Sequence, residues 1–231
     1  FFKISYIIFF RKGSWFATPL HLLLSDMNIE NEALFFAPEN EEQVREVLLK
    51  ADRMQRKIAL RGAQSSAPAA GGAIVLSTLK FNRIREIERS DLLLETESGI
   101  LFPQLNEVML EYKCDLGAFE GTLGGCLCGK AAPESRKLIA SRIMAMRVML
   151  SNGDIVRLGS RAVKDVAGYR IFPLMLDSEG KLGLILTVTL NLAPLYRDFR
   201  THKSVPSGET KSSRILYDAV KKALDPDDIL I

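Results

Sequence analysis

Nine residues near the middle of the chain, GTLGGCLCG at 121–129, contain four glycines. Because glycine has no Cβ, a loop of this composition can adopt positive φ and lie closely against a flat or charged ligand. The same composition also occurs in ordinary turns and bulges. On its own the stretch leaves a ligand cradle and a plain turn equally open, so the segments around it have to decide between them.

A strand, a helix and a second strand precede this stretch. Residues 33–37 form a short apolar run typical of a strand, which Pro38 ends. Asn40 can cap a helix, with Gln43 three residues later as in a capping box. Apolar residues at helical spacing then predict the helix: Val44, Val47, Leu48, Ala51 and Met54. The second strand is predicted at 57–60.

The loop after that strand carries small and polar residues. Successive backbone N–H groups in such a loop form a nest that binds phosphate oxygens. Two serine hydroxyls can add donors, and the arginine can add charge or brace the loop. The residues are Arg61, Gly62, Ala63, Gln64, Ser65 and Ser66. A plain β-turn has the same composition, so the loop alone leaves both interpretations open.

Beyond this loop the pattern continues as strands, turns and two further helices. Strands are predicted at 73–76, 84–88, 92–97, 145–151, 155–158 and 184–192, and helices at 102–112 and around 216–223. Asn152-Gly153 predicts the turn of a hairpin, because this pair tolerates positive φ. We expect a second glycine-bearing turn at 177–183 and a loop or short helix at 164–172. Residues 1–32 show no clean period.

Charge and cysteine content limit the classes of function. The chain has 31 Lys and Arg against 28 Asp and Glu, a balance that does not favour a nucleic-acid-binding protein. Its three cysteines do not suggest a disulfide framework, so we expect a reducing compartment. The apolar residues 1–10 fall short of the roughly 20 residues that a membrane span requires. No transmembrane segment is predicted.

Two competing motifs are present in part. Residues 124–130 match most of a Walker-type phosphate loop, but Ala131 stands where a Ser or Thr should hold magnesium. Cys126 and Cys128 are spaced Cys-x-Cys, and the chain has only two histidines, so no four-ligand zinc site is predicted. The G-x-G-x-x-G fingerprint of a Rossmann fold is absent. We predict no metal site.

Four segments occur in an order and spacing typical of one flavoprotein family. They are FFAPENEEQVREVLLKADRMQRKIALRGAQSS, EGTLGGCLCGKAA, MRVMLSNGDIVRLGSRAVKDVAGY and DSEGKLGLILTVTLNLAP. Together they resemble the FAD-binding domain of the vanillyl-alcohol oxidase and p-cresol methylhydroxylase family. Within it, the likeness is greatest to the FAD-binding subunit of bacterial glycolate oxidase. The segments are similar, in turn, to the family's pyrophosphate loop with its flanking elements, its flavin loop, its hairpin with a Gly-Tyr segment, and its last turn and strand.

The resemblance implies an α+β fold, the two-subdomain FAD-binding domain of the p-cresol methylhydroxylase type, with FAD between the subdomains. We expect an N-terminal extension at 1–32, subdomain 1 at 33–118, subdomain 2 at 119–195 and a C-terminal tail with one helix at 196–231. FAD would be bound non-covalently, because no histidine lies in the family's attachment loop. The implied FAD-binding residues are Arg61, Gly62, Ala63, Gln64, Ser65, Ser66, Gly121, Thr122, Gly124, Gly125, Cys128, Gly183 and Ile185.

The chain departs from the family pattern in several places. Gln64 lies where relatives often carry a further glycine, Asp177 replaces a glycine, and Lys181 replaces a threonine. Arg170 stands where an acid is usual, and 133–143 lacks the expected tyrosine-glycine and arginine-aspartate pattern. Residues 196–231 are all that follow Leu195. We therefore expect the family's cap domain to be absent or much shortened, and the sequence names no catalytic residue.

The resemblance implies an FAD-dependent oxidoreductase, and its first form is the FAD-binding subunit of a glycolate-oxidase-like dehydrogenase. Such a subunit would oxidise a small 2-hydroxy acid and pass electrons to the other subunits of its complex. We expect it in the cytoplasm, with peripheral association with the inner membrane open through that complex. The alternative is a non-catalytic scaffold or assembly subunit that kept the fold and lost turnover. A nucleotide triphosphatase built on 124–130 is a distant third.

Overall fold

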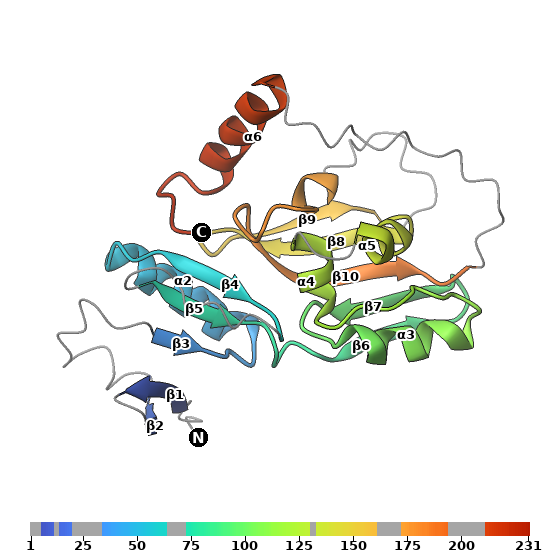
Figure 1. The fold of residues 1–231 in the computed structure, drawn as a ribbon, viewed down its shortest axis with the longest axis horizontal. Coiled ribbons are helices and arrows are strands. Elements are labelled where there is room, and N and C mark those ends of the chain that lie inside the picture. The colour runs from blue at the N-terminus through green and yellow to red at the C-terminus, as the bar shows by residue number, and fades with distance from the viewer. Residues whose placement is uncertain are drawn as a thin grey trace.

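The computed structural model of the 231-residue chain describes residues 6–11, 14–19, 34–63, 73–129, 133–160, 172–193 and 211–231. Its strands form a hairpin, a three-stranded sheet and a five-stranded sheet (Figure 1). The strands are β1 Tyr6–Arg11, β2 Ser14–Pro19, β3 Leu34–Phe36, β4 Ile58–Arg61, β5 Ile74–Ser77, β6 Ile84–Glu88, β7 Leu93–Glu97, β8 Ile143–Met149, β9 Ile155–Gly159 and β10 Leu184–Asn191. The helices are α2 Glu41–Arg53, α3 Phe102–Glu111, α4 Leu123–Cys128, α5 Pro133–Ala140 and α6 Lys211–Leu224, with a 3₁₀ turn, η1, at Phe172–Met175.

The predicted strand–helix–strand unit forms most of the smaller sheet. Its strands run parallel in the order β3-β5-β4, and α2 connects β3 to β4. The Asn40 side chain caps α2, because its Oδ1 accepts a hydrogen bond from the Gln43 N–H at 2.9 Å. Four residues of the predicted stripe are buried: Val44, Val47, Leu48 and Ala51. Met54 is 46% exposed, because α2 ends at Arg53 before it can bring Met54 onto the buried face.

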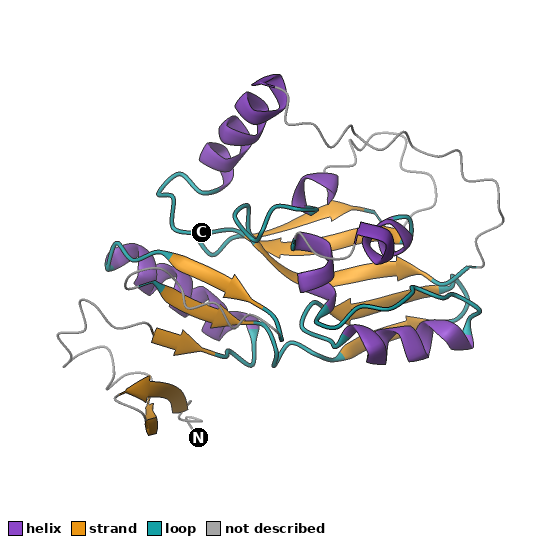
Figure 2. Ribbon diagram, in the orientation of Figure 1, coloured by secondary structure: helices purple, strands orange, loops and turns teal. Residues whose placement is uncertain are grey.

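The larger sheet is antiparallel, in the order β6-β7-β10-β8-β9. Its central strand, β10, is buried along nearly its whole length. Helices α3, α4 and α5 cover one face of this sheet (Figure 2). On the other face, Leu184 and Leu186 pack into the same apolar cluster as Val44 and Leu48 of α2. Coverage from both sides explains why this strand reads as a continuous apolar run.

Along the chain, the change from the smaller to the larger sheet falls between Ser77, the end of β5, and Ile84, the start of β6. The sequence grouped β6 and β7 with the first subdomain, whereas both strands pair within the five-stranded sheet. The subdomain boundaries at 118 and 195 remain predictions about folding units. The predicted α+β class is confirmed. Residues 1–32, which show no clean period, include the β1–β2 hairpin.

The C-terminal segment returns to the smaller sheet after α6. Ile58 N–H donates to the Ile229 carbonyl at 2.6 Å, and Ile231 N–H donates to the Ile58 carbonyl at 2.9 Å, so the last residues run alongside β4. The buried Asp225 carboxylate accepts the backbone N–H groups of Ile229 and Leu230 and pairs with Lys221. The chain end therefore extends the edge of the parallel sheet. None of the helices within the described ranges combines the length and apolar character that a bilayer crossing requires.

Candidate functional site

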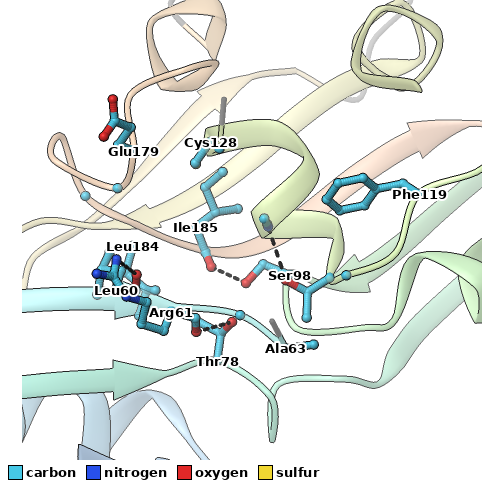
Figure 3. A pocket seen from close by; sticks show the side chains of 18 of the residues that line it. Leu60, Arg61, Ala63, Thr78, Ser98, Phe119, Cys128, Glu179, Leu184 and Ile185 are labelled. Carbon is cyan, nitrogen blue, oxygen red and sulfur yellow. Dashed lines mark hydrogen bonds between the residues drawn. The ribbon is translucent and has the colours of Figure 1, made fainter. Parts of the chain in front are cut away.

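A pocket of about 490 Å³ lies where the parallel sheet meets α4 and the start of β10 (Figure 3). Its walls come from the carboxyl ends of β4 and β5, from the segment entering α4, from α4 itself and from the turn before β10. Ligands commonly bind beyond the carboxyl ends of parallel strands. The location of the pocket is therefore typical of a binding site.

The structure brings together ten residues that the sequence predicted to bind a cofactor. They are Arg61, Gly62, Ala63, Gly121, Thr122, Gly124, Gly125, Cys128, Gly183 and Ile185, and all of them line the pocket. Gln64, Ser65 and Ser66 lie outside the described residues. These ten residues come from three segments that are far apart in the sequence. Their meeting in one pocket is therefore not a consequence of sequence proximity. Their contact with a ligand stays a prediction.

Other lining residues were not in the predicted FAD-binding set, although all except Thr78, Ser98 and Phe119 lie in the segments that carry the resemblance: Leu60, Thr78, Ser98, Phe119, Glu120, Gly129, Glu179, Gly180 and Leu184. A signal existed for Thr78, because it directly follows a strand of the parallel sheet, where ligands tend to bind. Its backbone N–H donates to the Arg61 carbonyl at 2.9 Å. Phe119 and Glu120 adjoin the glycine-rich stretch but belong to no periodic pattern that would have singled them out.

The glycine-rich stretch is not a loop, as the sequence suggested, but largely the short helix α4. Its N-terminal N–H groups are satisfied within the protein. Leu123 donates to the Ile100 carbonyl at 2.9 Å, Gly124 donates to the Ser98 carbonyl at 2.7 Å, and Gly125 donates to Thr122 Oγ1 at 3.1 Å. Capping by Thr122 and these tertiary partners offsets the low helix propensity of glycine.

This geometry argues against the phosphate-loop interpretation. A phosphate loop presents free backbone N–H groups to the ligand, whereas those of residues 123–125 already have acceptors. Lys130 and Ala131 lie outside the described residues. Gly124 and Gly125 thus contribute space to the pocket by lacking side chains, rather than donors.

The other end of α4 is fixed by Arg136 of α5 and by the turn at 177–179. Arg136, only 8% exposed, donates from Nε to the Cys126 carbonyl at 2.9 Å and from Nη2 to the Gly129 carbonyl, and its Nη1 pairs with Asp177. The N–H groups of Asp177 and Glu179 donate to the Leu127 and Cys128 carbonyls at 3.1 and 2.8 Å. The carbonyls that a helix end leaves without partners are thereby satisfied.

Asp177 and Arg136 explain two departures from the family pattern. Asp177 has φ 60°, in the left-handed region where glycine is favoured and aspartate is tolerated. Its carboxylate pairs with Arg136, which lies in the segment 133–143. The residue that replaces the glycine therefore meets a cation from the other divergent segment.

Ser98 connects three walls of the pocket. Its buried hydroxyl donates to the Ile185 carbonyl at 2.5 Å, and its N–H donates to the Leu186 carbonyl at 3.0 Å (Figure 3). Its own carbonyl accepts the Gly124 N–H. One residue thus ties the end of β7 to the start of both α4 and β10. A network of this kind holds pocket walls rigid before any ligand arrives.

Two glycines in the pocket lining are required by close packing around them. A Cβ on Gly62 would lie 2.3 Å from Thr122 Oγ1, so a larger residue would push the β4 end away from α4. Gly183 has φ 150°, and a Cβ there would lie 2.6 Å from Val148 Cγ1. The approach at Gly62 lies between two walls of the pocket, whereas the approach at Gly183 lies within the larger sheet, between the start of β10 and β8.

Arg61 supplies the pocket with an unused cationic donor. Its side-chain Nη1 donates to the Leu60 carbonyl at 3.2 Å, but its buried Nε has no hydrogen-bond partner. A buried donor without a partner costs free energy, of the order of 1–3 kcal/mol. Because Arg61 also lines the pocket, its guanidinium gives this end of the pocket a positive charge that suits phosphate or carboxylate.

Burial favours the neutral, protonated form of the thiols near the pocket. Burial raises the pKa of both Cys126 and Cys128 to about 11, against a smaller effect of the nearby Arg136 charge. No group of three or more His, Cys, Asp or Glu suited to a metal occurs in the part of the chain that the structure describes.

Comparison with known families identifies the domain. The model of the family described as FAD binding domain matches residues 33–159. The chain belongs to this FAD-binding family. The predicted resemblance and the predicted cofactor, FAD, are both confirmed. The pocket fits the cofactor, because Arg61 brings positive charge for a pyrophosphate and Leu60, Phe119 and Ile185 bring apolar surface for its rings.

Relatives of this FAD-binding domain include characterised oxidoreductases. It is 30% identical over 178 residues to the mitochondrial D-lactate dehydrogenase [cytochrome] of Arabidopsis thaliana, covering 72% of this chain and 31% of the relative. It is 27% identical over 194 residues to glycolate oxidase subunit GlcD of Bacillus subtilis, covering 78% and 40%. A solved alkyldihydroxyacetonephosphate synthase has the same fold, with a TM-score of 0.54 at 20% identity over 68% of this chain and 31% of its own. The chain thus spans well under half the length of these relatives.

Proposed function

We propose that this chain is the FAD-binding subunit of a glycolate-oxidase-like dehydrogenase, which oxidises a small 2-hydroxy acid and passes the electrons to partner proteins. The observation that carries the proposal is the pocket itself, where predicted FAD-binding residues from three distant segments converge beside an unused arginine donor. The substrate class is supported by relatives named D-lactate dehydrogenase and glycolate oxidase subunit.

Different residues of the pocket would bind different parts of the cofactor. Arg61 would hold the cofactor's pyrophosphate, together with the loop 62–66, and Gly121, Thr122, Gly124, Gly125 and Cys128 would lie along the ring systems. Gly183 and Ile185 would close the wall formed by β10. Bound FAD supplies the hydride acceptor for oxidation of the substrate's α-carbon. Ser98 would keep α4 and β10 at a constant separation through its hydrogen bonds.

The proposal extends to the setting of the chain. Its partners would be other subunits of a glycolate-oxidase-like complex, and it would act in the cytoplasm or at the inner membrane through that complex. FAD would be held without a covalent bond. The units 33–118 and 119–195 would be the two subdomains that enclose it.

The test is an absorption spectrum of the purified chain with FAD, before and after anaerobic addition of glycolate or D-lactate. We expect a yellow complex that is bleached by a 2-hydroxy acid and not by its oxidised 2-oxo product, which is the matched control. Denaturation should release all of the flavin. A yellow complex that neither acid bleaches would contradict the proposed activity, and a protein that retains the flavin after denaturation would contradict non-covalent binding.

The second candidate is a scaffold or assembly subunit that binds FAD without turnover. The observation that favours it is the short connection between β10 and α6, residues 192–210, which leaves no room there for a domain that could cover the pocket. Under this alternative the flavin is bound but stays oxidised with every 2-hydroxy acid. Bleaching at a steady, enzyme-like rate would exclude it.

A further inference from the structure

We propose that Phe119 is an aromatic wall of the pocket and stacks on one of the flat rings of bound FAD. The inference rests on FAD binding by this domain, but it assigns a contact to a residue outside the predicted FAD-binding set. Phe119 lines the pocket on the side opposite Leu60 and Glu179 (Figure 3). It lies in the irregular segment between α3 and α4, whose residues Ala118 and Glu120 are exposed.

The ring of Phe119 is held in place from two sides. It makes an edge-to-face contact with the fully buried Phe102, with the ring centroids 5.6 Å apart and the planes at 82°. At Gly121, a Cβ would lie 2.7 Å from Phe119 Cε1, so the ring occupies space that any other residue at position 121 would need. The glycine at this position therefore serves the placement of the ring.

The backbone around Phe119 is fixed as well. The Ser135 hydroxyl of α5 donates to the Ala118 carbonyl at 2.9 Å. On the other side, Phe102 N–H donates to the Gly121 carbonyl at 2.8 Å. An aromatic ring fixed in this way loses little conformational freedom when a ligand stacks on it, and such preorganisation strengthens binding.

The placement complements Arg61. Arg61 offers charge at the end of β4, whereas Phe119 offers an apolar π-surface on another wall of the same pocket. A dinucleotide carries a charged centre and a flat ring system at each end, so one molecule can use both. Stacking of a nucleic-acid base on an aromatic side chain contributes roughly 1–3 kcal/mol, which corresponds to about a 5- to 150-fold change in affinity.

The test compares the intact chain with Phe119→Leu and Phe119→Tyr, titrated with FAD, and with FMN and ADP as competitors of FAD. Leucine keeps apolar packing against Phe102 but has no ring, and tyrosine keeps the ring. We expect Phe119→Leu to weaken FAD binding at least fivefold. Phe119→Tyr should bind within about twofold of the unaltered chain. Phe35→Leu, at an exposed phenylalanine away from the pocket, is the matched control.

The competitors identify the ring. Weakened FMN binding with unchanged ADP binding would assign the isoalloxazine, and the reverse would assign the adenine. Unchanged affinity for both would overturn the stacking proposal while leaving FAD binding intact. If Phe119→Leu does not fold, Phe119→Met replaces it, because methionine adapts to irregular gaps. Failure of the unaltered chain to bind FAD would overturn both this inference and the proposed function.

Discussion

The two walls of the pocket differ in how their polar groups are used. In the α4 wall, the donors at the start of the helix and the carbonyls at its end have partners within the protein. In the β4 wall, the buried Nε of Arg61 has none. The glycine-rich wall thus offers shape, and the wall that looks like an ordinary strand end offers hydrogen bonding and charge.

This difference bears on the role of the glycine residues in the site. A glycine-rich stretch is commonly read as a set of free N–H groups that grip phosphate. Here Gly62 lets the end of β4 lie close to Thr122 at the start of α4, while the donor without a partner belongs to Arg61. The two walls should therefore respond to different substitutions, one through stability and pocket width and the other through ionic affinity.

Replacing Arg136 should cause the largest loss of stability, because Arg136 holds the C-terminal end of α4 in place. Arg136→Met would leave the carbonyl of the buried Cys126 and that of the half-buried Gly129 without their side-chain donor. At about 1–3 kcal/mol for each unsatisfied buried group, we expect a loss of about 2–4 kcal/mol in the free energy of unfolding. Urea-induced unfolding measures it.

Asp177→Gly is the control for the Arg136 prediction. It removes the ion pair but keeps the carbonyl contacts, and glycine is at ease at φ 60°. Since the Asp177 side chain is 59% exposed, we expect a change within about 1 kcal/mol. Equal destabilisation by both substitutions would mean that the ion pair, not the carbonyl contacts, holds the helix.

Gly62→Ala should have the next largest effect, on the width of the pocket. The new Cβ would meet Thr122 Oγ1, which must then move or push the β4 end away. We expect FAD to bind about a hundredfold more weakly, equivalent to about 2.7 kcal/mol. Adding Thr122→Ala removes the clashing oxygen and should restore most of the affinity, although loss of the cap costs about 1 kcal/mol of stability. A double variant as weak as Gly62→Ala would show that the clash is not the cause.

Arg61→Met tests the other wall. A hydrogen bond to a charged group contributes about 1.5–3 kcal/mol, so we expect FAD and ADP to bind at least tenfold more weakly and with a smaller salt dependence. Riboflavin, which lacks phosphate, should be unaffected. Arg89→Met, in the turn between β6 and β7 and outside the pocket lining, controls for the change in net charge. An equal loss for riboflavin would mean that Arg61 supports the pocket structurally instead.

The sequence predicts this fold where short-range patterns are strong. The Asn40 cap and the apolar spacing after Val44 determine α2, and Asn152-Gly153 lies at the turn between β8 and β9 as predicted. The convergence of residues 61–63, 121–128 and 183–185 follows from the order of motifs in the family. It could not follow from local pattern alone, because the three segments meet only in the tertiary structure.

The helical state of α4 could not be predicted from its own residues. Two of its six residues are glycine. Its N-terminal donors are satisfied partly by Ser98 and Ile100, which lie more than 20 residues earlier, and its C-terminal carbonyls partly by Arg136 of the next helix. The pairing of β6 and β7 within the larger sheet could not be predicted for a related reason, since strand patterns do not specify which partner a strand pairs with. Phe119 carries no periodic signal, and only the geometry around Gly121 reveals why its ring matters.

The smallest expected loss of stability concerns the ion pairs between α2, which packs on the smaller sheet, and strands of the larger sheet. Glu41, at the start of α2, pairs with both guanidinium nitrogens of Arg147 on β8 at 2.7 and 2.9 Å, and with Arg85 on β6 at 3.1 Å. The hydrogen bond from Arg147 and its charge, with Arg85, lower the pKa of Glu41 against the opposing effect of burial. These pairs join the helix of one sheet to strands of the other.

A lowered pKa in the folded state means that the stabilisation is fully present above the usual carboxyl pKa and is lost as pH falls through the lowered value. Because the pair is partly exposed, we expect Glu41→Gln to cost about 0.5–1 kcal/mol at pH 7 relative to Glu42→Gln. Glu42 shares the first turn of α2, so it corrects for the helix dipole. The gap between the two variants should shrink as the pH falls below about 4, measured by urea unfolding. A gap that stays constant down to roughly pH 3 would mean that packing of Glu41, and not its charge, joins the two sheets.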